Sequence, residues 1–163
     1  MSAQTLPELI RDCYLERVSL LMQHENVAQV TTDYDANNAY QYIIAREQTH
    51  LSWLQHALLD LGAPQPADPA PPAALSVKGD GWKSLASQDS RANTQFVEKW
   101  RPKLETITNA RHKGMLGVIM GETLEHARLF EQCAAGRKDV IGKSLEINDH
   151  TGDVMPVRFV GDI

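Results

Sequence analysis

The chain has 163 residues, of which 42% are hydrophobic and 23% are charged, and its formal net charge is -5. This length suits one domain with a hydrophobic core of its own, and the composition is ordinary for a soluble globular protein. The negative net charge argues against a nucleic-acid-binding surface and against an anionic membrane as a partner, because both would require a basic face.

The start of the sequence lacks a basic stretch followed by an apolar one, so no signal peptide is predicted. No apolar run approaches the roughly 18–20 residues that a membrane span needs. The two cysteines, Cys13 and Cys133, form neither a disulfide framework nor a zinc-binding pattern, and both fall on apolar helical stripes. We therefore expect two buried thiols in a cytoplasmic protein.

Apolar residues recur every three or four positions in four segments, which predicts an all-α protein with four amphipathic helices. Turn-forming residues between the first two segments make those helices antiparallel neighbours. The expected helices cover about residues 7–30, 36–61, 84–108 (or 89–108) and 112–135. Residues 1–138 are expected to form the bundle, and 139–163 a short extended or hairpin tail on the bundle or on a partner subunit.

A proline-rich segment, residues 63–81, separates the second predicted helix from the third and contains five prolines. Each flank holds only two helices, too few for a core of its own. A segment of this length can span the ~39 Å of a helix of about 26 residues. We therefore predict a long crossover that runs along the bundle, rather than a linker between domains.

Several acidic and imidazole side chains fall on stripes that should face the core. Glu47 and His50 are one helical turn apart on the second helix, among Tyr40, Ile43 and Leu54. Burying such groups without partners costs several kcal/mol. A pair of divalent metal ions, bridged by carboxylates and capped by imidazoles, would satisfy them. The candidate ligands are Glu16, Glu47, His50, Glu122, Glu125 and His126.

The stretch from Glu47 through Leu54 to Pro64 resembles the second helix of ferritin-like proteins, especially the rubrerythrin-related ones. In that family, two antiparallel helix pairs are joined by a long crossover. Helices 1 and 3 each give a Glu, and helices 2 and 4 each give a Glu-x-x-His motif. The resemblance implies a ferritin-like four-helix bundle that binds iron or manganese and carries out redox chemistry on dioxygen or peroxide.

Carried over to this sequence, the resemblance implies that Glu47 bridges the metals and that His50 and His126 cap them. Glu16 and Glu122 would complete the shell, with Glu125 as a further candidate. No catalytic residue is assigned, and a homodimer is expected.

Two features depart from the family pattern. Thr123 stands three residues before His126, where the pattern has Glu, and the third helix has no acid on its predicted core stripe, which Asn93 extends. One alternative is therefore a metal-free ferritin-like bundle that serves as an interaction or structural protein. A site of three histidines, His24, His50 and His126, is another.

Overall fold

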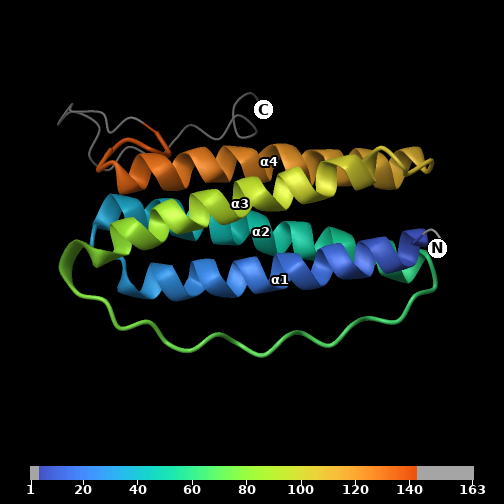
Figure 1. The fold of residues 1–163 in the computed structure, drawn as a ribbon, viewed down its shortest axis with the longest axis horizontal. Coiled ribbons are helices and arrows are strands. Elements are labelled where there is room, and N and C mark those ends of the chain that lie inside the picture. The colour runs from blue at the N-terminus through green and yellow to red at the C-terminus, as the bar shows by residue number, and fades with distance from the viewer. Residues whose placement is uncertain (1–3, 143–163) are drawn as a thin grey trace, which may run out of the picture.

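A computed structural model describes residues 4–142, which fold into four helices and, within that range, no strand (Figure 1). The helices are α1 (Leu6–Val30), α2 (Tyr34–Asp60), α3 (Trp82–Leu104) and α4 (Ala110–Ala134), and a short 3-10 helix, η1 (Gly79–Gly81), precedes α3. The prediction of an all-α protein with four helices is confirmed. The tail predicted for residues 139–163 lies mostly outside the described residues, which end at residue 142.

The ends of the helices follow from local chemistry. Glu8 accepts a hydrogen bond from the backbone N–H of Thr5 at 2.8 Å, which satisfies an amide left free at the start of α1. Asp33 caps α2 by accepting from Ala36 N at 2.9 Å, and Asn109 caps α4 in the same way. Gly62, with φ of 66°, follows α2 in a left-handed conformation that glycine adopts without strain.

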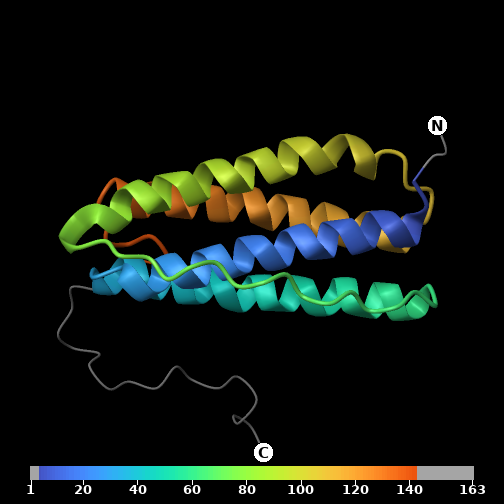
Figure 2. The same cartoon turned by 60° about the horizontal axis from the view of Figure 1, so that its bottom comes forward.

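The bundle consists of two antiparallel helix pairs, since α1 packs chiefly on α2, and α3 chiefly on α4 (Figure 1). The connector between α2 and α3 returns along the length of the bundle, so α2 and α3 run in the same direction. It passes over the α1–α2 pair (Figure 2). Tyr14 donates to the Asp68 carboxylate at 2.9 Å, and Asn26 donates to the Ala73 carbonyl at 2.7 Å, so the connector is bound to α1 at two heights.

The core contains two apolar clusters, one toward each end of the bundle. The first includes Cys13, Leu54 and Phe96, and the second includes Cys133 and Phe130. Both cysteines are free thiols and buried, as predicted. Buried polar side chains from all four helices gather where the clusters meet, and we call them the polar layer: Arg17, His24, Glu47, His50, Asp89, Asn93, Thr123 and His126.

None of the helices within residues 4–142 is long and apolar enough to cross a lipid bilayer.

Candidate functional site

Glu47 lies at the centre of the polar layer and is fully buried. Its Oε2 is 2.8 Å from His24 Nδ1, and its Oε1 is 3.4 Å from an Nη of Arg17. Burial alone would raise the pKa of Glu47, but the positive charges of His24 and Arg17 outweigh it and hold that pKa below its usual value. Conversely, burial opposes the charge on His24, yet the Glu47 carboxylate raises the pKa of that imidazole.

The guanidinium of Arg17 joins three helices at this point. It donates to Thr123 Oγ1 of α4 at 3.1 Å and to His50 Nδ1 of α2 at 3.3 Å, and it lies over the Phe96 ring of α3, 5.2 Å from the centroid. A guanidinium has donors only, so His50 Nδ1 must be the acceptor. The ring proton of neutral His50 is therefore on Nε2. Burial, followed by the charge of Arg17, lowers the pKa of this imidazole.

On the other side of His50, the layer reaches the surface between α2 and α4. His50 Nε2 donates to Glu122 Oε2 at 2.6 Å, and Arg46 donates to both oxygens of the same carboxylate, which is 30% exposed. His126 stacks on His50 with ring centroids 6.1 Å apart, and its buried Nδ1 has no hydrogen-bond partner. Burial lowers the pKa of His126 to about 4, so this imidazole is neutral at pH 7.

A second buried acid, Asp89 of α3, lies on the opposite side of His24. Tyr40 donates to Asp89 Oδ2 at 2.6 Å, Gln23 donates to Oδ1 at 2.6 Å, and His24 Nε2 is 4.0 Å from Oδ1. Burial raises the pKa of Asp89. The expectation that the third helix carries no acid on its core stripe is therefore wrong. The signal was present in the sequence, because Asp89 precedes Asn93 by four residues, a helical spacing.

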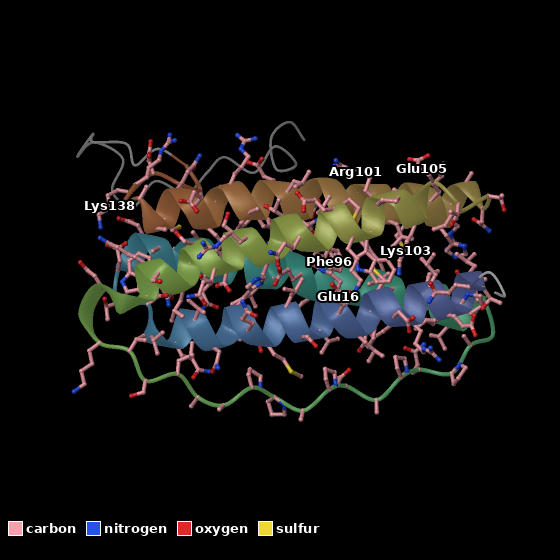
Figure 3. The ribbon with its side chains drawn as sticks, in the orientation of Figure 1. Glu16, Phe96, Arg101, Lys103, Glu105 and Lys138 are labelled. Carbon is pink, nitrogen blue, oxygen red and sulfur yellow. The ribbon has the colours of Figure 1, made fainter. Side chains whose placement is uncertain are left out.

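Glu16, predicted as a metal ligand, does not join the polar layer. Its carboxylate accepts from Lys99 Nζ at 2.6 Å and from Trp100 Nε1 at 3.0 Å, on the face of α1 that meets α3 (Figure 3). The neighbouring Arg17 takes the inward position, because it follows the buried Tyr14 by three residues and so shares its face.

Glu125 also lies outside the layer, since it is exposed and forms an ion pair with Arg128 at 3.1 Å. Four of the six predicted residues are therefore brought together in or beside the layer: Glu47, His50, Glu122 and His126. Arg17 and Asp89 were missed in the sequence analysis, and His24 was considered there only as a member of the three-histidine alternative.

The donors in the layer do not fit a carboxylate-bridged pair of metal ions. Such a site takes one Glu from each of two helices and Glu-x-x-His from each of the other two. The corresponding inward side chains here are Arg17 on α1, Glu47 and His50 on α2, Asn93 on α3, and Thr123 and His126 on α4. Of these six side chains only Glu47 is a carboxylate, where the pattern has four, and the other buried acid of the layer, Asp89, is bound by Tyr40 and Gln23. Within residues 4–142, no three His, Cys, Asp or Glu side chains are grouped so that they could hold a metal ion.

Comparison of the chain with family models, with curated proteins and with solved structures finds no match. The resemblance to ferritin-like proteins therefore stays a prediction.

The buried hydrogen bond between Tyr40 and Asp89 gives a direct test of how tightly the layer is built. A Tyr40→Phe variant would leave Asp89 Oδ2 without its donor, and we expect a loss of about 1–3 kcal/mol in the free energy of unfolding. Urea denaturation measures this loss. Tyr34→Phe is the matched control, because Tyr34 is 78% exposed and should change stability by no more than about 0.5 kcal/mol. Equal stabilities of the two variants would contradict the prediction.

Proposed function

We propose that this chain is a ferritin-like four-helix bundle in which a protein cation takes the place of the metal ions. It then serves as a binding or structural protein rather than as a metal-dependent oxidoreductase. One observation carries the proposal: the Arg17 guanidinium lies among Glu47, His50 and Thr123, at 3.4, 3.3 and 3.1 Å. These three side chains stand where the family pattern would supply metal ligands.

The electrostatics of the layer support this reading. A divalent ion about 4 Å from the guanidinium would be repelled by about 8 kcal/mol at an effective dielectric constant of about 20. Glu47 is already paired with the cations Arg17 and His24, so its charge is compensated without a metal. Asn93 and Thr123 provide no negative charge to offset additional metal ions.

Metal analysis of the purified protein tests the proposal. We expect no transition metal above background after anaerobic loading with Fe(II) or Mn(II), and the same melting temperature with and without a chelator. A triple variant, Arg17→Glu/Asn93→Glu/Thr123→Glu, would restore four carboxylates and should gain Co(II) absorption bands that the parent chain lacks. Stoichiometric Fe(II) retained by the unaltered chain would overturn the proposal, whatever the triple variant does.

A second candidate is a single iron or manganese ion at the edge of the layer, for which His50, Glu122 and His126 would first have to converge, since they are not grouped to hold a metal ion in this structure. Two observations favour it: the buried Nδ1 of His126 has no hydrogen-bond partner, and His50, on which His126 stacks, contacts the Glu122 carboxylate at 2.6 Å. Glu122 would first have to release Arg46. When bound, the ion would supply redox chemistry with dioxygen or peroxide.

The same loading experiment separates the two candidates. One equivalent of metal that is lost in His126→Gln but kept in Glu125→Gln would establish the edge site, because Glu125 is exposed on the same helix and paired with Arg128. The expected homodimer and the cytoplasmic location stay predictions under either candidate.

A further inference from the structure

A cavity of about 350 Å³ opens between α1, α3 and the connector, well away from the edge where Glu122 lies. This volume falls in the range of sites that hold small organic molecules. Its walls are mixed, and their apolar part includes Met22 and Val27 from α1, Leu85 from α3 and Leu75 from the connector. The connector passes over the α1–α2 pair before it reaches α3 (Figure 2).

The polar side chains of the lining are Ser19, Gln23, Asn26, Gln88 and Asp89, and among them Gln23 and Asp89 are hydrogen-bonded to each other. Asp89 is fully buried, and the half-buried Gln23 donates to its Oδ1 at 2.6 Å. The other donor to this carboxylate, the Tyr40 hydroxyl, is also neutral. The nearest cationic group is His24 Nε2, which lies 4.0 Å away and makes no hydrogen bond there. The carboxylate at the end of the cavity is thus bound by neutral donors only.

We propose that this cavity binds a small primary amine, with its ammonium group at Asp89 and its hydrocarbon part along the apolar wall. The ammonium would replace the Gln23 amide as donor to Oδ1, which exchanges a neutral hydrogen bond for a charge-assisted one. Gln23 can yield this position because it lies on the cavity side of the carboxylate and is only partly buried. The proposal does not depend on whether the polar layer holds a metal.

The lining also selects against other ligand classes. No lysine, arginine or histidine is among the side chains that line the cavity, so a carboxylate or phosphate would meet no cation and would face Asp89. A neutral alcohol of the same length could fill the apolar part but would gain no charge pairing. The ammonium group is therefore the distinguishing chemistry.

Titration with n-pentylamine, 1-pentanol and pentanoate at pH 7, followed by amide NMR shifts, tests the proposal. We expect the amine to shift amides of α1, α3 and the connector around the cavity, and to bind about tenfold more tightly than the alcohol, with no binding of the acid. Asp89→Asn keeps the shape but removes the charge, and should abolish the preference for amine over alcohol.

A second variant keeps the test decisive if Asp89→Asn does not fold. Ala73 lines the cavity from the exposed connector, and its neighbour Ala74 is exposed without lining it. Ala73→Trp should block amine binding, whereas Ala74→Trp should leave it unchanged. Equal binding of the three probes, no amine binding, or amine binding that survives Ala73→Trp would each overturn the proposal. None of these outcomes bears on metal content.

Discussion

An Arg17→Met variant is expected to lose about 3–5 kcal/mol of folding free energy, a large share of the stability of a domain of this size. The cost arises because the substitution leaves the fully buried Glu47 carboxylate with one cation fewer, and leaves His50 Nδ1 and Thr123 Oγ1 without their donor. Methionine fills a similar volume, so the loss reports charge and hydrogen bonding more than packing. Guanidinium chloride denaturation measures it.

The control for this prediction is Arg101→Met on α3, because Arg101 is exposed at the surface (Figure 3). That variant should change the free energy of unfolding by no more than about 0.5 kcal/mol. Adding Glu47→Gln to Arg17→Met should recover part of the loss, since the unpaired charge is removed together with its partner. An Arg17→Met variant as stable as Arg101→Met would show that the guanidinium is not a structural cation.

Acid should destabilise the bundle well above the pH at which ordinary carboxylates titrate. The pKa of His126 is about 4 in the folded chain, against an ordinary value of 6.5, because burial disfavours its charged form. The unfolded chain therefore binds this proton first, and stability falls as the pH drops from about 7 toward about 4. A shift of this size corresponds to a loss on the order of 3 kcal/mol. His50, whose pKa is also lowered, contributes with the same sign.

His24 changes the pH dependence of folding stability in the opposite direction, because its pKa is raised by Glu47. Its contribution is fully present below pH 6.5 and is lost as the pH rises through the folded pKa. The pH dependence of the unfolding free energy from 4 to 8 therefore separates the groups. His126→Gln should flatten the acid side of the curve, whereas His56→Gln, at an exposed position of α2, should not. Identical acid slopes in both variants would contradict the assignment to His126.

The four helices could be predicted because the spacing of their apolar residues is a local property of the sequence. The sequence could not predict which residue of a broad apolar stripe points into the core. Glu16 and Arg17 are adjacent, and an apolar arc of at least about 100° admits either of them. A fully buried arginine is rare, so residue type favoured Glu16. Only the packing of α1 on α2 and α3 decides between the two.

Asp89 shows a different limit of prediction from the sequence. Aspartate favours helix N-caps, so a helix starting at Asp89 was a reasonable alternative to one starting at Ser84. The structure instead starts α3 at Trp82, whose side chain is 1% exposed and packs in the same apolar cluster as Phe130. Burial of that tryptophan extends the helix and carries Asp89 into its interior. By contrast, Glu47 and His50 were found from spacing alone, because their helix has one unambiguous stripe.

The polar layer has a further consequence for how the four helices are aligned along the bundle. A helix that slid by one turn, about 5.4 Å, would still bury much of its apolar stripe, because apolar residues recur along the stripe at each turn. The same slide would separate Arg17 from Glu47 and Thr123, and His24 from Asp89. Every misaligned arrangement therefore leaves charges buried without partners. The layer thereby selects one alignment among several that would hide similar amounts of hydrocarbon.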